Sequence, residues 1–451
     1  MTKQRFYIKT LGCKVNQYES QLIREGMVRA GYIEAPDIDQ ADIYVVNSCT
    51  VTSASDSKSL YFVRNGLKGN GRCVIVTGCM VEDEDLDLSK FKGAQFIVKN
   101  KDKHRIAEIV SHGAKRSSCH NGTGQVAHSE SISGLKGHTR VFVKVQDGCS
   151  NVCSYCKVRI VRGRSISRPV QDVLDECSKL IANGVREIVL TGICLGAYGR
   201  DIKKGIDISR LIEELCGIEG DWRLRLSSIE PGDIGNALVS QLESQKRLCR
   251  HLHIPFQSGD DYILKKMKRP YRRRDYIAVV DRLKQVIPDM AISTDIMVGF
   301  PGETEERFEE TVNFIETVQP MRVHMFPFSK RKGTEAYSYK GNVPARVKKE
   351  RKKRLSSIAA RLSREFIDKF LNKEVQVLIE DKKSAEGILQ GYTDRYIKVS
   401  IDGPDSLKNR LVSCRLVLSE QLRYPLKRIT TPARPVEDLP PAIPNLLGAA
   451  F

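Results

Sequence analysis

The chain has 451 residues, enough for two or three domains, and its 74 Lys and Arg against 55 Asp and Glu give a net charge of +19. No apolar run approaches the roughly 20 residues that cross a bilayer, so we exclude a membrane-spanning segment and expect a soluble protein. Excess positive charge favours a polyanionic partner, with nucleic acid as the first candidate if a binding module supports it.

The first 112 residues repeat one pattern, in which a short apolar strand ends at a cysteine and an amphipathic segment follows. The predicted strands cover residues 5–12, 42–48 and 74–78, and they lead into Cys13, Cys49 and Cys79. Residues 19–30 have helical periodicity, with one apolar face formed by Leu22, Ile23, Met27 and Val28. The cysteines are separated by about the length of a βα unit, so we predict a small parallel α/β domain.

Parallel strands bring their carboxyl ends to the same edge of a sheet, where ligands bind. Cys13, Cys49 and Cys79 would therefore meet, which predicts a [4Fe-4S] cluster held by three cysteines with one iron left open. The alternative is that these are buried structural cysteines. Burial explains Cys73, which lies at the start of its strand, better than it explains three cysteines that each follow the end of a strand.

Residues 113–138 are rich in Ser, Gly, His and Lys without periodicity, and we interpret them as a linker in which Cys119 is an incidental thiol. From residue 139 strands and helices alternate. We predict strands at residues 140–145, 187–190, 223–226, 251–254, 291–298 and 322–326, with helices at 170–183, 208–216, 236–245, 272–286 and 305–318. Six such units predict a partial (βα)6 barrel within residues 139–370, with functional residues at the carboxyl ends of its strands.

A second cysteine triplet, Cys149-x3-Cys153-x2-Cys156, follows the first strand of this barrel. Three thiolates are one ligand short of a closed zinc or iron–sulfur site, and the nearest downstream histidine for a zinc site is His251. The 13 cysteines are an odd number and no secretory leader precedes the first strand, so disulfides fit less well than metal-bound thiolates in a reducing cytosol. The spacing favours a [4Fe-4S] cluster with one open iron over zinc.

This triplet, with Tyr155 just before its last cysteine, resembles the motif of radical S-adenosylmethionine (SAM) enzymes. Residues 10–20, 46–52 and 77–79 are similar to the N-terminal domain of methylthiotransferases, radical SAM enzymes with two [4Fe-4S] clusters, and the likeness extends over nearly the whole chain. Residues 14–20 resemble the branch that acts on N6-threonylcarbamoyladenosine at position 37 of tRNA. The resemblance implies that one cluster and SAM generate a radical that removes hydrogen from C2 of adenine, that the second cluster supplies sulfur, and that another SAM supplies the methyl group.

Strand ends of the barrel and the cluster loop provide candidate SAM-binding residues: Tyr155, Gly192, Glu230, Gln257 and Asp295. A structural role, such as helix capping or strand-end hydrogen bonding, is the alternative for each of them. We assign no metal to His251 and His253, which alternate along one strand without an acidic or cysteine partner nearby in sequence. Cys194 belongs to neither triplet, and we expect no catalytic side chains beyond the cluster ligands.

Several cationic and aromatic groups are candidates for RNA contacts. Arginines follow the second triplet closely enough to hold phosphates of an anticodon loop: Arg159, Arg162, Arg164 and Arg168. Residues 344–371 predict one long helix with a buried stripe that includes Val347, Leu355 and Phe366, and with a strongly cationic first half.

Residues 371–430 contain short strands at 374–379, 387–391, 396–401 and 415–418, which predict a small β-barrel similar to the RNA-binding TRAM domain. Its candidate RNA-binding residues are Tyr392, Arg395, Tyr396 and Lys398, which combine stacking surface with positive charge. We expect the proline-rich residues 431–451 to be a disordered tail.

We therefore predict a cytoplasmic, monomeric tRNA methylthiotransferase of three domains, with two [4Fe-4S] clusters and SAM as cofactors. Its partners would be the tRNA anticodon loop, an electron donor and a sulfur donor. Two alternatives keep the same chemistry, with isopentenyladenosine at position 37 or an aspartate of a ribosomal protein as substrate. A third alternative, from another functional class, is an RNA-binding iron–sulfur sensor that catalyses nothing.

Overall fold

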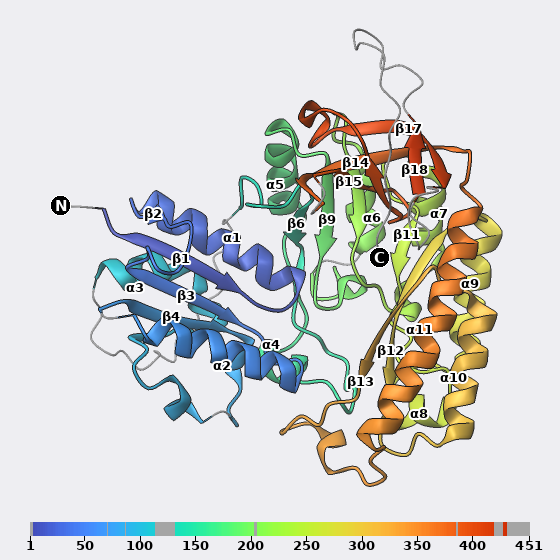
Figure 1. Cartoon of the computed structure of the whole chain (residues 1–451), viewed down its shortest axis with the longest axis horizontal. Coiled ribbons are helices and arrows are strands. Elements are labelled where there is room, and N and C mark those ends of the chain that lie inside the picture. Colours follow the sequence, from blue (N-terminus) through green and yellow to red (C-terminus); the bar gives the residue numbers. More distant parts are fainter. Residues whose placement is uncertain are drawn as a thin grey trace.

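The computed structural model describes residues 3–69, 71–85, 87–112, 131–202, 205–384, 387–418 and 427–430. Most of the predicted linker, with Cys119, and the whole predicted tail lie outside these residues. Figure 1 shows an N-terminal sheet on the left, a central set of strands surrounded by helices, and the C-terminal strands at the top. None of the described helices combines the length and the apolar character needed to cross a membrane.

The N-terminal sheet is parallel, in the order β2 (Ile33–Glu34), β1 (Arg5–Thr10), β3 (Ile43–Ser48), β4 (Cys73–Gly78) and β5 (Phe96–Ile97). Because side chains alternate along a strand, each face of the sheet forms its own core. Val45 and Ile75 pack with residues of α1 (Lys14–Arg29) and α3 (Ile106–Ser111), whereas Val46 and Val76 pack with α2 (Ser53–Leu67) on the other face.

This arrangement confirms the predicted α/β class and the three strands that end at cysteines. The predicted helix at 19–30 begins earlier, at Lys14, because Cys13 occupies the extended N-cap position directly after β1. Val28, placed on its apolar face by the sequence pattern, is 53% exposed because it lies in the last turn of α1.

The central strands are β6 (Val141–Lys144), β9 (Glu187–Thr191), β10 (Arg223–Leu226), β11 (His251–His253), β12 (Ala291–Val298) and β13 (Arg322–Pro327). They form two parallel three-stranded sheets, β6-β9-β10 and β11-β12-β13, joined by bridges such as Ser228 to His253. The outer helices are α5 (Val170–Ala182), α6 (Ile208–Cys216), α7 (Asn236–Ser244), α9 (Arg273–Val286) and α10 (Glu305–Val318). The partial (βα)6 barrel is therefore confirmed, and β6 and β13 are its edge strands.

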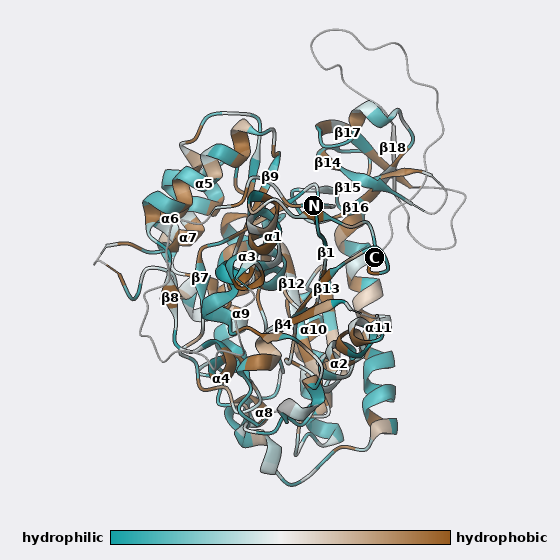
Figure 2. Cartoon of the chain, turned by 90° about the vertical axis from the view of Figure 1, so that its left-hand side faces the viewer, coloured by the Kyte–Doolittle hydropathy of each residue, from teal (hydrophilic) through white to brown (hydrophobic). Residues whose placement is uncertain are grey.

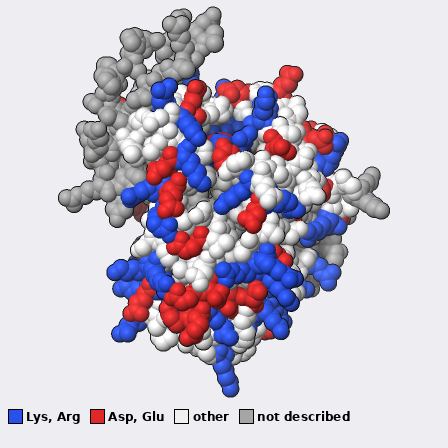
Figure 3. Space-filling view, turned by 90° about the vertical axis from the view of Figure 1, so that its right-hand side faces the viewer, with Lys and Arg blue, Asp and Glu red and all other residues white. Residues whose placement is uncertain are grey.

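The long basic segment forms α11 (Ala345–Asp368), which packs against β13 and α10. Leu355 and Phe366 are buried as predicted, and Leu362 is buried with them, whereas Val347 is only half-buried. Several cations of this helix pair with acids of α10, as Arg354 does with Glu309. Figure 3 shows blue and red groups side by side on this side of the molecule, so the helix does not present a purely cationic face.

The C-terminal strands close into the predicted small barrel, in the order β14 (Glu374–Lys383), β15 (Leu389–Thr393), β16 (Lys398–Ile401), β18 (Lys427–Thr430) and β17 (Leu411–Leu418). They lie together at one end of the molecule (Figure 2). The sequence analysis missed β18, a strand of only four residues. It also began β16 too early, because Tyr396 has a positive φ of 64° and belongs to the preceding turn.

Candidate active site

The second cysteine triplet lies in a loop that follows the short strand β7 (Gln146–Asp147). Gly148 has a φ of +69°, and a Cβ atom there would lie 1.9 Å from the carbonyl oxygen of Arg164, so only glycine fits. The amide Nε2 of Gln146 donates to the carbonyl oxygens of Asp147 and Gly148, each at 2.7 Å. The start of the loop is therefore held in place by a side chain of β7, the short strand directly before it.

Each thiol of this triplet has a nitrogen donor within reach of its sulfur. The backbone N–H groups of Asn151 and Val158 donate to Cys149 Sγ and Cys156 Sγ, both at 3.4 Å, and Arg269 Nη1 lies 3.8 Å from Cys153 Sγ. Such donors stabilise metal-bound thiolates and adjust the potential of an iron–sulfur cluster. The three donors therefore suit sulfur ligands that carry negative charge.

Cys194 lies next to this triplet, although we placed it in neither cysteine set. Its hydrogen bond to Cys149 lowers the pKa of that thiol to about 7, whereas burial raises the pKa of Cys156 to about 12. Among the described residues, no three Cys, His, Asp or Glu side chains are grouped closely enough to hold a single metal ion. A zinc site needs its ligands grouped around one ion, whereas the three thiolates of a [4Fe-4S] cluster bind three different irons.

The structure brings the N-terminal cysteines to the same edge of their sheet, where Cys49 and Cys79 are buried and Cys13 is exposed. A Cβ atom on Gly12, which has a φ of +92°, would lie 2.9 Å from Cys49 Sγ. Burial raises the pKa of Cys79 to about 11, while the positive charge of Arg162 opposes that shift. The three strands that lead into these cysteines thus end at one edge, and the role of the thiols as joint cluster ligands stays a prediction.

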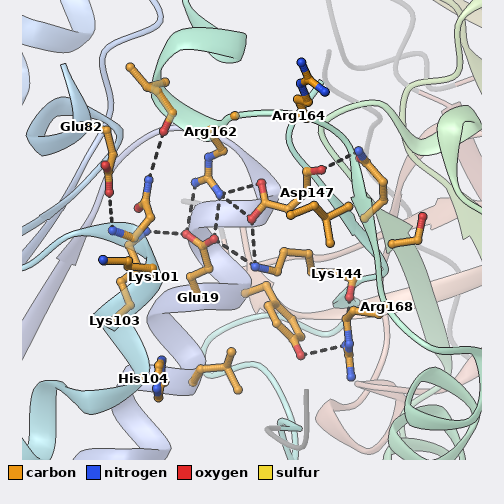
Figure 4. Close-up of a pocket in the computed structure, with 18 of the residues that line it drawn as sticks. Glu19, Glu82, Lys101, Lys103, His104, Lys144, Asp147, Arg162, Arg164 and Arg168 are labelled. Carbon is orange, nitrogen blue, oxygen red and sulfur yellow. Dashed lines mark hydrogen bonds and ion pairs between the residues drawn. The ribbon is translucent and has the colours of Figure 1, made fainter. Parts of the chain in front are cut away.

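Arg162, at the end of α4 (Val158–Arg162), connects the two cysteine regions. Its Nε donates to Cys79 Sγ at 3.4 Å, and its Nη1 donates to Glu19 at 2.7 Å and to Asp147 at 3.1 Å. Burial would raise the pKa of Glu19, but the charges of Arg162, Lys103 and Lys144 hold it well below 4.5. Figure 4 shows these groups converging at the wall of a cavity of about 400 Å³ between the N-terminal sheet and the barrel.

The arginines predicted to hold RNA phosphates divide into two pairs. Arg162 and Arg168 face inward, with 1% and 12% of their side chains exposed, and Arg168 pairs with Glu176 at 2.6 Å. Arg159 and Arg164 are exposed, and Arg164 lies at the cavity apart from the ion network in Figure 4. The donors of Arg162 and Arg168 are used inside the protein, so only the exposed pair can reach a phosphate without breaking buried ion pairs.

Of the residues predicted to bind SAM, Glu230 has the most informative surroundings. Arg269 binds its carboxylate with both terminal nitrogens, including a contact of 2.9 Å from Nη1 to Oε1, while the same nitrogen faces Cys153. The sequence analysis missed Arg269, which lies in the connection between α8 (Asp261–Lys266) and α9, away from every strand end. Its only signal in the sequence is its place in a basic loop before Pro270.

Gln257 has two features expected at a ligand site. It is a non-glycine residue with a φ of +68°, and its buried Oε1 has no hydrogen-bond partner among the described residues. A Cβ atom on Gly192 would lie 2.8 Å from Gln146 Oε1, so this glycine makes room for the residue that holds the cluster loop. Asp295 pairs with His253 Nε2 at 3.2 Å, and Tyr155 packs edge-on against Phe300.

The segment predicted to bind RNA in the C-terminal barrel is docked against the central barrel. Arg225 donates to the carbonyl oxygens of Thr393 and Asp394 at 2.9 and 2.8 Å, and Tyr396 Oη accepts from Arg140 Nη1 at 2.7 Å. Arg395 pairs with Asp289, so its charge also serves this contact. Tyr392 and Lys398 are half-buried and face each other in the register of β15 and β16. Residues 393–396 of this segment thus contribute to an interface within the chain, and RNA binding by Tyr392, Arg395, Tyr396 and Lys398 stays a prediction.

Comparisons with known proteins agree with this geometry. Residues 143–315 match the radical SAM superfamily, and residues 5–99 match the uncharacterized protein family UPF0004. The chain is 35% identical over 90% of its length to a threonylcarbamoyladenosine tRNA methylthiotransferase MtaB of Bacillus subtilis, of which it covers 92%. It is 37% identical over 87% of its length to the protein of the same name from Thermotoga maritima, of which it covers 90%. A tRNA-2-methylthio-N(6)-dimethylallyladenosine synthase of Acetivibrio thermocellus is 34% identical over 92% of this chain and 88% of that protein.

Solved structures support the fold. The radical SAM methyltransferase TsrM from Kitasatospora setae, with cobalamin and a [4Fe-4S] cluster bound, superposes with a TM-score of 0.54 at 13% identity, covering 74% of each chain. The cobalamin-dependent SAM radical enzyme OxsB superposes with a TM-score of 0.52 at 11% identity, over 82% of this chain and 56% of that one. At such identity the likeness concerns the arrangement of strands and helices alone.

Proposed function

This chain belongs to the radical SAM methylthiotransferases, and we propose that it adds a methylthio group to C2 of N6-threonylcarbamoyladenosine at position 37 of tRNA. A radical SAM enzyme carries a [4Fe-4S] cluster and SAM. Cys149, Cys153 and Cys156 are the residues that would hold this cluster, and their three sulfur-directed donors fit that role. When bound, the cluster and SAM supply a 5′-deoxyadenosyl radical that can take hydrogen from a carbon without useful acidity, such as C2 of adenine.

The observation that carries the proposal is a contact between the region of Cys79 and the region of the second cysteine triplet. Arg162 belongs to the helix that directly follows the second triplet, yet it donates to Cys79 of the first triplet. This hydrogen bond connects the edge of the N-terminal sheet that carries Cys79 with the helix that follows the second triplet. We propose that Cys13, Cys49 and Cys79 hold a second [4Fe-4S] cluster, which would supply the sulfur atom.

Residues around the second triplet provide the remaining parts of a SAM site. Gln146 fixes the loop, while Glu230 offers a carboxylate that Arg269 already orients. Gln257 offers an unpartnered buried oxygen at a strained position, which a ligand donor would satisfy. We propose that Tyr155, Gly192, Glu230, Gln257 and Asp295 line the site, with Glu230 and Gln257 as its polar contacts.

Two features favour the threonylcarbamoyl substrate over the alternatives. Two relatives that carry this modification in their names are 35% and 37% identical to the chain, whereas a dimethylallyladenosine synthase is 34% identical. The difference is small, so the residues that follow Cys13 and resemble the threonylcarbamoyl branch provide the second argument. A ribosomal protein substrate or a non-catalytic RNA sensor has no such support among these relatives.

The substrate implies the partners and the compartment. We propose that the enzyme binds the tRNA anticodon loop in the cytoplasm as a monomer, with an electron donor to reduce its cluster and a sulfur donor to renew the second one. Arg159 and Arg164 are exposed beside the cysteine edges and would contact phosphates of the loop.

Reconstituted enzyme tests the function directly. It is incubated with SAM, a reductant and anticodon stem-loop RNA carrying either N6-threonylcarbamoyladenosine or isopentenyladenosine, and the nucleosides are analysed by mass spectrometry. We expect 5′-deoxyadenosine and a methylthio product from the threonylcarbamoyl RNA. Product from the isopentenyl RNA alone would reassign the substrate, and absence of 5′-deoxyadenosine would favour the sensor.

A further inference from the structure

The inner face of the central barrel is polar over much of β11 to β13, whereas barrels of this kind usually fill their interior with Val, Ile and Leu. On β11 to β13, Leu252, Ile292 and Val323 belong to the apolar core that includes residues of the outer helices. Side chains alternate along a strand, so their neighbours turn to the opposite, inner face. Ala291, Met297 and Phe326 share this face. Its polar members are His251, His253, Ser293, Asp295, Arg322 and His324.

Hydrogen bonds across the inner face connect these groups. Ser293 Oγ lies 2.9 Å from His251 Nε2 and 3.0 Å from His253 Nδ1, and His253 Nε2 lies 3.2 Å from Asp295. His324 is exposed although it belongs to an inner strand face, so solvent reaches this part of the barrel. A ligand that enters between the strands would therefore meet polar side chains.

Most cations near this face have an acidic partner. Arg140 pairs with Glu380, Arg225 pairs with Glu187, and the carboxylate of Asp295 faces His253. Arg322 is different, because its Nη2 meets only the carbonyl oxygen of Tyr396, at 3.4 Å, and its guanidinium lies 5.4 Å from that ring. In the described part of the chain, no carboxylate is among the main charged groups around it.

Lys14 is another cation near this face for which the described residues provide no ion pair. It is the first residue of α1, directly after Cys13, and it lies within electrostatic range of His324, Tyr396 and Arg140. Lys14 and Arg322 are both half-buried. Partial removal of two uncompensated cations from water costs free energy, which an anionic ligand would offset. The protein itself offsets little of this positive charge. The carbonyl oxygen of Tyr396 accepts a hydrogen bond from Arg322, and the carboxylate of Asp295 faces His253.

We propose that Lys14 and Arg322 bind the carboxylate of the threonylcarbamoyl group and thereby select this nucleoside over one with a neutral N6 substituent. The inference rests on the proposed function and names the residues that decide its substrate. In adenine, C2 and the N6 substituent belong to the same edge of the ring and are separated by N1. If C2 of the base faces Cys13, its N6 substituent therefore extends past Lys14, the next residue in the chain. Arginine suits a carboxylate in particular, because its planar guanidinium can donate two parallel hydrogen bonds.

The test compares two anticodon stem-loop RNAs, one with the free carboxylate and one in which it is a methyl ester. Binding to the cluster-loaded protein is measured by fluorescence anisotropy, without turnover. We expect the wild-type protein to bind the acid about tenfold to a hundredfold more tightly than the ester. Lys14→Met and Arg322→Met should each reduce this preference, Arg322→Lys should retain part of it, and Arg274→Met, which changes an arginine with 79% exposure, should leave it unchanged.

Equal binding of acid and ester by the wild-type protein would overturn the inference, and this comparison requires no variant to fold. A variant that weakens both RNAs by the same factor would also overturn it for that residue. The function and the inference fail in different ways. The function fails if the threonylcarbamoyl RNA gives no methylthio product, whereas the inference fails if product forms while the acid and the ester bind alike.

Discussion

At the scale of single residues, Arg162 shows how burial determines a role. Its side chain is 1% exposed, and its guanidinium is shared among Glu19, Asp147 and a thiol. We expect Arg162→Met to lower the free energy of unfolding by about 1.5–3 kcal/mol, because Glu19 and Asp147 lose the cation that they share and keep only lysine partners. Thermal and urea unfolding followed by circular dichroism would measure the loss.

Arg164→Met is the matched control, because Arg164 lines the same cavity but its side chain is exposed. Its effect should stay within about 0.5 kcal/mol. Equal destabilisation by both changes would show that the buried network adds nothing beyond a surface arginine.

The same network makes stability depend on acid. The pKa of Glu19 in the folded protein is well below 4.5, although burial alone would raise it, because Arg162, Lys103 and Lys144 favour the carboxylate. A depressed pKa gives stability that is full above the unfolded value and lost as the pH falls toward the folded one. The stability difference between the wild-type protein and Glu19→Gln should therefore be constant between pH 7 and about pH 5 and should shrink below about pH 4.5. A difference that stays constant down to pH 3 would contradict the assignment.

At the scale of elements, the turn before β16 attaches the C-terminal barrel to the central one. The ring of Tyr396 stacks on His251 with centroids 4.9 Å apart, and Arg225 lies 4.6 Å from it. We expect Tyr396→Ala to cost about 3–5 kcal/mol, as aromatic truncations in cores do. Hydrogen exchange should increase in β14 to β17 and at the β10 and β11 residues that meet the turn.

Tyr396→Phe removes the hydroxyl group and keeps the ring, so it measures the two contributions separately. It leaves Arg140 Nη1 without its 2.7 Å acceptor, so a smaller cost of about 1–3 kcal/mol is expected, with the stacking retained. Lys398→Ala provides the control in the same segment. If the alanine variant unfolds like the wild-type protein, the turn is not the attachment that its contacts indicate.

At the scale of the whole molecule, the central barrel is contacted from two sides. Arg331 reaches from beyond β13 to Thr50 and Asp56 near Cys49, and Arg168 of the barrel meets Tyr18 of α1. The N-terminal edge is thereby held against the region of the second triplet from both ends. Two facing clusters predict about eight irons per chain.

Replacing Cys13, Cys49 and Cys79 by Ala should remove roughly half of this iron and abolish methylthiolation while SAM cleavage continues. Iron analysis and 5′-deoxyadenosine release measure the two effects separately. A matched triple variant, Cys73, Cys216 and Cys249 to Ala, should keep the full iron content. Full iron in the first variant would reject the N-terminal cluster.

Sequence periodicity was enough to predict the α/β class, the partial barrel, the small C-terminal barrel and both cysteine triplets. These features depend on local patterns, such as apolar strands that end at Cys13, Cys49 and Cys79 or helices with one apolar face. The (βα) pattern also placed Glu230 and Gln257 at strand ends, because parallel strands bring their carboxyl ends together.

Which charged groups face outward was decided by tertiary structure alone. Arg162 and Arg164 are close in sequence, yet one is buried among carboxylates and the other is exposed, because only the docked N-terminal sheet supplies Glu19 and Cys79. Arg269 and the turn at Tyr396 gain their roles in the same way, from partners far away in the chain. A local pattern specifies an element and its periodicity, whereas the partner of a charge depends on which surfaces meet when the elements assemble.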